Sequence, residues 1–152
     1  MEAKNPDYKA AVREIFDRAA FVNDVGIRLA DCGPGWCESE LAIKPRHYQH
    51  HDVVHAGVQA TIADHTAGAA ATTLIRDTEL VLSAEFKINL LNTARGEVLR
   101  CRAEVLKAGR TLIVVESEVF ARWGDKERLA AKATVTLAVV RAGGAAREAD
   151  QT

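Results

Sequence analysis

The sequence lacks the features that mark several specialised classes of protein. Its three cysteines, Cys32, Cys37 and Cys101, are odd in number and have no CxxC spacing, which argues against a disulfide framework or a cysteine-rich zinc site. Acidic and basic residues nearly balance at a net charge of −1, so we expect no nucleic-acid or membrane partner. No apolar run approaches the ~18 residues of a membrane span, and the first residues lack the apolar core of a signal peptide. We therefore expect a cytoplasmic location.

The rest of the composition is that of an ordinary globular protein. The chain has 152 residues, of which 48% are hydrophobic and 27% charged, so it is long enough to bury a core. We expect one domain over residues 1–141. The remaining residues, 142–152, contain almost no side chain that burial would stabilise, and we expect a disordered tail there.

Hydrophobic periodicity divides the chain into two helices and six strands. Apolar residues at three- and four-residue spacing predict an amphipathic helix over residues 7–20. Two short strands are expected around the turn at residues 33–35, and a long helix from about Gly57 to Ile75. Strict alternation then predicts four strands, at about residues 80–90, 99–105, 113–122 and 131–139.

The order of these elements predicts their arrangement. Short polar turns between the last four strands indicate an antiparallel meander. In the first of these strands, the even-numbered residues from Leu80 to Leu90 are expected to share the apolar face. The long helix is apolar on most sides and rich in Ala and Gly, which lets a curled sheet approach it closely. The expected fold class is α+β, an antiparallel sheet wrapped around one long central helix.

The most informative polar residues lie where the long helix begins, in QHHDVVHAGVQATIAD, residues 49–64. The first turn of a helix has backbone N–H groups without partners and a positive dipole end, which suits an oxyanion. Ala56 and Gly57 would offer these groups with no bulky side chain in the way. Asp64 lies two turns further on, on about the same face. An unpaired carboxylate buried in so apolar a helix is energetically costly and usually functional, so Asp64 is a candidate catalytic residue.

The histidines of residues 50–55 raise the alternative of a metal site. Together with Asp52 and Asp64 they have the chemistry to ligate zinc, but they form no familiar ligand spacing. We therefore expect no metal and no other cofactor. His65 faces about 100° away from Asp64 on the helix and is interpreted as structural.

The segment HAGVQATIAD, with SAEFKINLLNTARGEV and LAAKATVTLAV further on, resembles the hotdog-fold acyl-CoA thioesterases of the phenylacetate-pathway (PaaI-like) type. The resemblance covers roughly residues 21–140. Such enzymes have a His-Gly-Gly motif, with Asn six residues before the histidine and Asp or Glu nine residues after it. Here these positions hold Gln49, then His55, Ala56 and Gly57, then Asp64. The chain departs from the pattern at Ala56 and Gln49.

The resemblance implies an acyl-CoA thioesterase that releases a free acid and CoA, with Asp64 as general base or as nucleophile. Ala56 and Gly57 would form the oxyanion hole, and the Gln49 amide would position water or thioester. His55 is expected to hold the loop in place through its ring nitrogens. The sequence does not separate the two roles of Asp64.

The resemblance also implies roles outside this segment. The hydroxyl of Ser83 is expected to help orient the attacking water. Arg95, Lys107 and Arg110, in expected turns, are candidates for binding the CoA phosphates. Similar proteins pair long strands across a dimer, so we expect a homodimer, with a tetramer as a further option. A non-catalytic acyl-CoA-binding hotdog protein and a hotdog dehydratase are the alternatives, and the sequence does not define the acyl group.

Overall fold

The computed structural model describes residues 1–143 of the protein. Two short helices and two strands come first, followed by a 3-10 turn, one long helix and four long strands. The elements are α1 (Tyr8–Arg18), α2 (Ala20–Val25), β1 (Ile27–Gly33), β2 (Trp36–Ala42), η1 (Pro45–His47), α3 (Ala56–Thr72), β3 (Glu79–Leu90), β4 (Val98–Ala108), β5 (Leu112–Trp123) and β6 (Lys126–Arg141). The predicted tail begins in the turn after β6, and its residues 144–152 lie outside the described residues.

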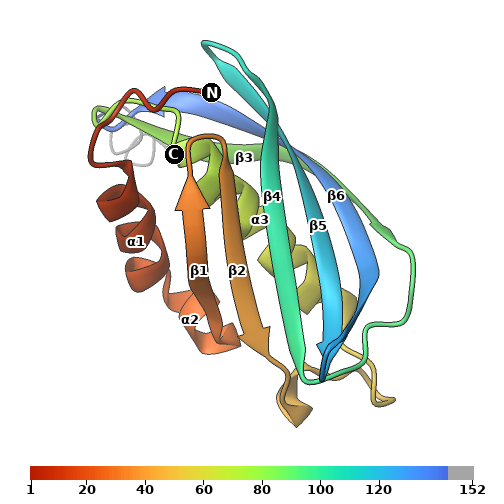
Figure 1. Cartoon of the computed structure of the whole chain (residues 1–152). Helices are drawn as coiled ribbons and strands as arrows, with labels where there is room; N and C mark the ends of the chain where they lie inside the picture. The colour runs from red at the N-terminus through yellow and green to blue at the C-terminus, as the bar shows by residue number, and fades with distance from the viewer. Residues whose placement is uncertain (144–152) are drawn as a thin grey trace, which may run out of the picture.

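The six strands form one antiparallel sheet that curls around α3 (Figure 1). The strand order is β1-β2-β4-β5-β6-β3. Nine of the seventeen residues of α3 are buried, most of them alanine, because only small side chains fit between the helix and the inner face of the sheet. The predicted fold class, an α+β hotdog fold with a long central helix, is confirmed.

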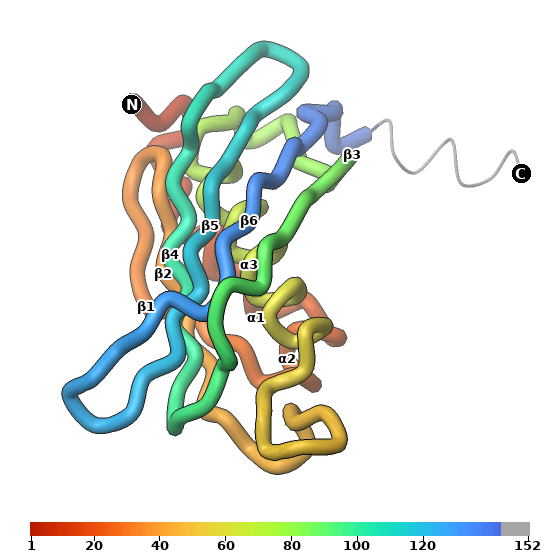
Figure 2. Tube along the Cα trace, turned by 90° about the vertical axis from the view of Figure 1, so that its right-hand side faces the viewer, coloured from red at the N-terminus to blue at the C-terminus, as the bar shows by residue number. Residues whose placement is uncertain are grey.

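The expected meander of the last four strands is wrong for its first member. The strands β4, β5 and β6 are consecutive neighbours, but β3 pairs with β6 and not with β4. Residues 91–97 are therefore not a tight hairpin turn: they carry the chain past the start of α3 to the middle of the sheet, where β4 pairs with β2. Figure 2 shows β3 beside β6 at the edge of the sheet, with α3 behind.

The predicted faces of β3 are also wrong in its first half. The pairing with β6 shifts by one residue between Ser83 and Glu85, so that Ala84 has no partner opposite it. Such a bulge moves the following residues to the other face of the sheet. Ser83 lies opposite the buried Leu137, so its side chain points toward the helix. After the bulge, the even-numbered residues from Phe86 to Leu90 point toward the helix as well. The even-numbered residues before the bulge point outward.

The helix predicted over residues 7–20 is α1, and a second short helix, α2, which the sequence analysis did not predict, follows it. The chain leaves the helical conformation at Ala19, and α2 continues at an angle until Gly26, whose φ of 98° ends it in the left-handed region. Val12 and Phe16, from the predicted apolar stripe, are the buried residues of α1. This short pair of helices packs over α3 and β1 and closes one side of the core (Figure 1).

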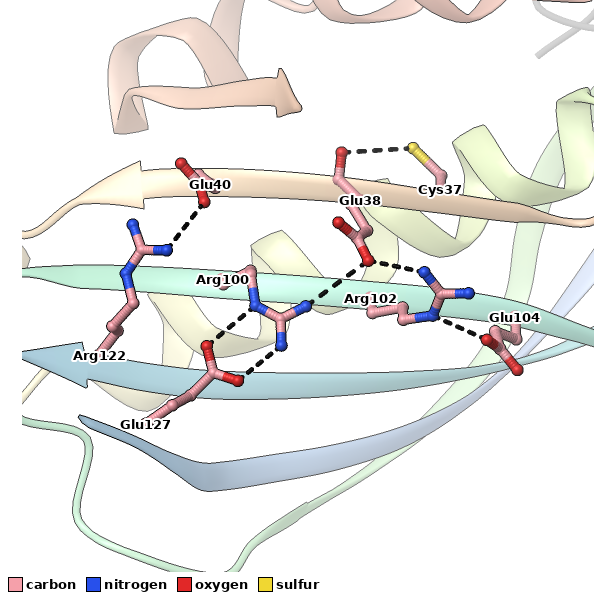
Figure 3. A network of polar contacts seen from close by, with 8 residues as sticks. All are labelled: Cys37, Glu38, Glu40, Arg100, Arg102, Glu104, Arg122 and Glu127. Atoms are coloured by element: carbon pink, nitrogen blue, oxygen red, sulfur yellow. Dashed lines mark hydrogen bonds and ion pairs between the residues drawn. The ribbon is translucent and has the colours of Figure 1, made fainter. Parts of the chain in front are cut away.

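Charged residues on the outer face of the sheet pair with one another (Figure 3). Arg100 binds Glu127 at 2.6 Å, and Arg102 binds Glu38 at 2.6 Å. Arg122 lies 3.5 Å from Glu40. Partly exposed pairs of this kind contribute little to stability, but they leave these arginines without free charge for a ligand. We call this group of residues the outer-face network.

Candidate active site

The predicted catalytic carboxylate lies on the side of α3 that the sheet leaves partly exposed. Asp64 is half-buried, and its Oδ1 accepts a hydrogen bond of 2.6 Å from the Ser83 hydroxyl on β3. The contact requires the Ser83 side chain to be on the helix side of β3. The bulge after Ser83 allows this while the even-numbered residues beyond it also face the helix. The structure therefore brings together two residues that are 19 positions apart and that the sequence analysis selected separately.

A pocket of about 580 Å³ opens beside this pair. Its walls are the side of α3 that carries Asp64, Gly68 and Thr72, the first half of β3, and α1. Ile15 and Leu137 belong to its mostly apolar lining. Asp64 and Ser83 lie at the boundary between apolar wall and solvent, a position in which a carboxylate can meet both an apolar acyl group and water.

The start of α3 offers one backbone donor. His55 is the N-cap residue, and its Nδ1 accepts a 2.9 Å hydrogen bond from the Gly57 N–H. A Cβ at position 57 would lie 3.1 Å from that ring nitrogen, so a larger residue there would press on the His55 ring. Within residues 1–143, the Ala56 N–H has no hydrogen-bond partner. Of the two N–H groups predicted for an oxyanion hole, the one of Ala56 is thus available and the one of Gly57 is engaged.

The loop before α3 is held by a histidine that the sequence analysis did not select. His47 is buried, accepts a hydrogen bond from the Lys44 N–H at Nδ1, and lies 2.7 Å from the Val25 carbonyl oxygen at Nε2. Its own carbonyl accepts from the His55 N–H. The backbone around the helix start is therefore fixed from two sides, as an oxyanion site requires.

Gln49 and Ala56 line a second hollow, of about 500 Å³, together with the segment after β3. The sequence analysis missed Gln59, whose side chain lies in this wall and is only 4% exposed. Its Nε2 donates to the Val54 carbonyl at 3.2 Å, while its Oε1 is buried without a partner. Gln59 follows Gln49 and His55 in a polar stretch, but nothing in the sequence distinguishes it from a surface residue.

Within one chain, Asp64 and the start of α3 at Ala56 are too far apart to act on the same carbonyl group. Ala56 and Asp64 are separated by eight helical residues, which corresponds to about 12 Å along the axis. Attack on a thioester requires base, water and oxyanion donor within a few ångströms of the same carbon. One chain therefore holds two separate groups of candidate residues, which we call the carboxylate half (Asp64 with Ser83) and the oxyanion half (Ala56 with its loop).

The edge of the sheet next to Asp64 is apolar and uncovered. On β3, Leu82, Phe86 and Leu90 are 51%, 43% and 52% exposed, and the outer side of the strand pairs with no other strand of the described residues. This edge is twelve residues long and presents unpaired backbone N–H and C=O groups, the kind of edge to which a further strand can add.

The three cations predicted to meet CoA phosphates are not neighbours. Arg95 precedes β4, and Lys107 and Arg110 lie at the other end of it, where β4 turns into β5. The twelve residues between Arg95 and Lys107 correspond to about 40 Å of strand. Figure 1 shows these two ends of β4 at opposite ends of the molecule, with the start of α3 near the Arg95 end.

Other potentially reactive side chains are buried in their neutral forms. Burial raises the pKa of the Cys101 thiol to about 12 and that of Cys37 further, so neither forms a nucleophilic thiolate. Burial lowers the pKa of His65, against the opposing effect of Asp64, and its ring packs edge-on against Phe16 at 4.5 Å. Among residues 1–143, no three His, Cys, Asp or Glu side chains are arranged to hold a metal ion.

The antiparallel sheet that curls around one long central helix defines the hotdog class of folds. The model of the thioesterase superfamily matches residues 51–127, and the chain belongs to that family. A thioesterase family protein from Silicibacter pomeroyi has 36% identity and a TM-score of 0.86, over 88% of this chain and 98% of that one. A conserved protein of Pseudomonas aeruginosa, PA5202, has 33% identity and a TM-score of 0.75, over 84% and 98%.

A relative with a named reaction is more distant in sequence. The 1,4-dihydroxy-2-naphthoyl-CoA hydrolase of Listeria monocytogenes is 24% identical, over 76% of this chain and 91% of its own length. These relationships support hydrolysis of thioesters in general. In the described part of the chain, no helix has the length and apolar character to cross a membrane. The predicted cytoplasmic location stays a prediction.

Proposed function

We propose that the protein hydrolyses acyl-CoA thioesters, in the manner of PaaI-like thioesterases, at a site formed by two copies of the chain. The observation that carries the proposal is the Asp64–Ser83 pair at the mouth of an apolar pocket. A pocket of about 580 Å³ is within the usual range for small-molecule sites, and its lining suits an apolar acyl group.

The dimer follows from the separation of the two half-sites. If β3 of one copy pairs antiparallel with β3 of a second, a twofold axis brings the oxyanion half of each chain toward the carboxylate half of the other. The same contact covers the exposed side chains of Leu82, Phe86 and Leu90. Each complete site then has Asp64 from one chain and the Ala56 N–H from its partner, and a homodimer contains two such sites. A tetramer of two dimers keeps this arrangement.

The reaction uses few groups. The Ala56 N–H stabilises the oxyanion that forms when the thioester carbonyl is attacked. As general base, Asp64 removes a proton from water; the water oxygen bonds to the carbonyl carbon, the C–S bond breaks and CoA leaves as the thiol. As nucleophile, the Asp64 carboxylate bonds to the carbonyl carbon, the C–S bond breaks and CoA leaves as the thiolate; water then hydrolyses the acyl anhydride to the free acid and the Asp64 carboxylate, and the thiolate takes up the proton that is released. In both routes the Ser83 hydroxyl positions the carboxylate, and the Gln49 amide is free to orient the water or the thioester.

Substitution of Asp64 by Asn tests the proposal, because it keeps the shape of the side chain and removes its charge. We expect turnover, measured as release of free thiol from a panel of acyl-CoAs, to fall roughly 10²–10⁴-fold. Folding and dimerisation should not change. Asp17→Asn changes an exposed aspartate of α1 that does not line the pocket beside Asp64; it is the matched control and should keep wild-type activity.

Two results would contradict the proposal. Near-normal activity of Asp64→Asn would make the carboxylate structural. A wild-type protein that binds acyl-CoA tightly but releases no thiol from any member of the panel would be the non-catalytic binder instead.

A further inference from the structure

We propose that Gln59 is a positioning residue for the oxyanion half of the site: its side chain fixes the loop that presents the Ala56 N–H to the thioester. This inference rests on the proposed function and deepens it, because it assigns a role to a buried residue that no sequence motif selects. Gln59 lies three residues beyond Ala56 on α3 and lines the same hollow of about 500 Å³ as Gln49.

The side-chain amide of Gln59 ties α3 to the loop before it. Its Nε2 donates a 3.2 Å hydrogen bond to the Val54 carbonyl oxygen. Among residues 1–143, no other group donates to that oxygen. The Val54 N–H donates in turn to the Ala94 carbonyl at 3.0 Å, in the segment that follows β3. Val54 is therefore held by the helix through its carbonyl group and by the segment after β3 through its N–H.

Two successive peptide planes connect this contact to the Ala56 N–H. The first plane contains the Val54 carbonyl and the His55 N–H, which donates to the His47 carbonyl at 2.8 Å. The second contains the Ala56 N–H and the His55 carbonyl, which accepts from the backbone N–H of Gln59 at 3.3 Å. The C=O and N–H of a trans peptide point in opposite directions, so a His55 carbonyl directed into the helix directs the Ala56 N–H away from it. Gln59 thus holds the first plane through its side chain and the second through its backbone.

The Gln59 side chain is an unfavourable choice for packing alone. It is 4% exposed, and its Oε1 has no hydrogen-bond partner among residues 1–143. A buried acceptor without a partner destabilises the fold, and a methionine of the same length would avoid this penalty. Local departures from what stability favours are expected at functional sites. The polar end of Gln59 is therefore better explained by the Val54 carbonyl that it holds than by the core that it fills.

The direction of the Ala56 N–H matters because no second donor is free beside it. The Gly57 N–H is bound to the His55 ring. Misplacement of a group by about 1 Å can lower turnover by on the order of 10²-fold. Loss of the Gln59 contact loosens the loop only partly, since the bonds to His47 and Ala94 remain. We therefore expect a smaller effect, a loss of roughly tenfold in kcat.

Gln59→Met tests the inference, because it keeps the length of the side chain and removes the amide. In assays of thiol release from an acyl-CoA, kcat should fall roughly tenfold while KM stays within about twofold of the wild type. The urea midpoint should change little, because the Val54 carbonyl loses its partner while the unpaired Oε1 is removed as well. Gln59→Leu, a second apolar variant, should show the same division between kcat and KM.

Thr73→Val is the matched control at the other end of α3. Thr73 is buried, and its hydroxyl donates a 2.6 Å hydrogen bond to the Ala70 carbonyl. The variant therefore also removes a buried bond between a side chain and a carbonyl of the same helix. It should lower the urea midpoint and leave kcat unchanged.

A double-mutant cycle with Ala56→Pro, which removes the N–H itself, separates positioning from a general effect on the fold. Without that N–H there is nothing for Gln59 to position, so in the Ala56→Pro background Gln59→Met should lower kcat by less than about twofold. An equal fall in both backgrounds would show that Gln59 does not act through the Ala56 N–H and would refute the inference. An unchanged kcat of Gln59→Met in the otherwise wild-type chain, or a rise in KM alone, would refute it as well.

Amide hydrogen exchange separates this inference from the proposed function, because it requires no hydrolysis. The N–H groups of Val54 and His55 should exchange faster in Gln59→Met than in the wild type. Unchanged exchange, with hydrolysis intact, would refute the positioning role and leave the thioesterase standing. Faster exchange in a protein that hydrolyses no thioester would support Gln59 as the residue that fixes the helix start and refute the thioesterase.

Discussion

Replacement of Ala56 by proline would remove one backbone N–H from the site and almost nothing else. Ala56 is the first residue of α3, where proline is well tolerated because the N–H at that position has no partner within the helix. The preceding residue, His55, has φ −57° and ψ 141°, the extended conformation that a following proline requires. Ala56 is exposed, so the ring has room. We expect the free energy of unfolding to change by less than about 1 kcal/mol.

Catalysis should respond very differently. Loss of one oxyanion donor lowers turnover by roughly 10²–10³-fold in enzymes of this chemistry, equivalent to about 3–4 kcal/mol of transition-state stabilisation. Because the Gly57 N–H is already bound to the His55 ring, no second donor is free to replace the missing one. Steady-state thiol release with an acyl-CoA substrate measures kcat and KM, and we expect the loss in kcat.

A matched variant separates the N–H from the methyl group. Ala56→Gly keeps the donor and should keep activity within a few-fold of the wild type, while a urea titration of both variants monitors folding. If Ala56→Pro folds normally and retains near-wild-type kcat, the helix start does not form the oxyanion hole and the reasoning is refuted.

Three further changes probe the surroundings of this site. Ser83→Ala removes the 2.6 Å hydrogen bond to Asp64 and should lower kcat about tenfold, and Ser83→Thr should restore most of it; equal losses in both would show that the hydroxyl is not what matters. Gln49→Ala should lower kcat more than it raises KM, and the opposite split would assign Gln49 to substrate binding. Burial lowers the pKa of His65, so the unfolded state binds more protons and stability falls as the pH decreases below about 6.5 toward the pKa of the folded state. His65→Leu should reduce this acid-side loss in urea titrations at about pH 7.5 and about pH 5.5, and an unchanged pH dependence would exclude His65 as its cause.

Local patterns were sufficient for much of the fold. The alternation of buried residues in β4, β5 and β6 was predicted correctly because each of these strands has one face on the core and one face in solvent. The long apolar helix was predicted to within a few residues for the same reason: its burial pattern is a property of its own sequence.

The position of β3 could not be predicted in this way. Its residues pair with residues of β6 that are more than 40 positions away in the sequence, and the short connection to β4 was taken to mean that β3 and β4 are adjacent. The bulge at Ala84 leaves no mark in the sequence, although it decides that Ser83 faces Asp64. The candidate site residues between Gln49 and Asp64 could be selected from the sequence because they lie close together along the chain. Gln59 was missed because its burial is decided by the tertiary structure and not by its neighbours in the sequence.

Mixing two inactive variants tests the shared site most directly. Asp64→Asn lacks the carboxylate half and Ala56→Pro lacks the oxyanion half, so refolding or co-expressing the two together creates mixed dimers with one intact site and one doubly altered site. At equal amounts, half of the dimers are mixed, and we expect the mixture to recover about a quarter of the wild-type turnover. If instead the mixture is no more active than the mean of its two parents, Asp64 and Ala56 do not meet across a dimer interface and the account is wrong.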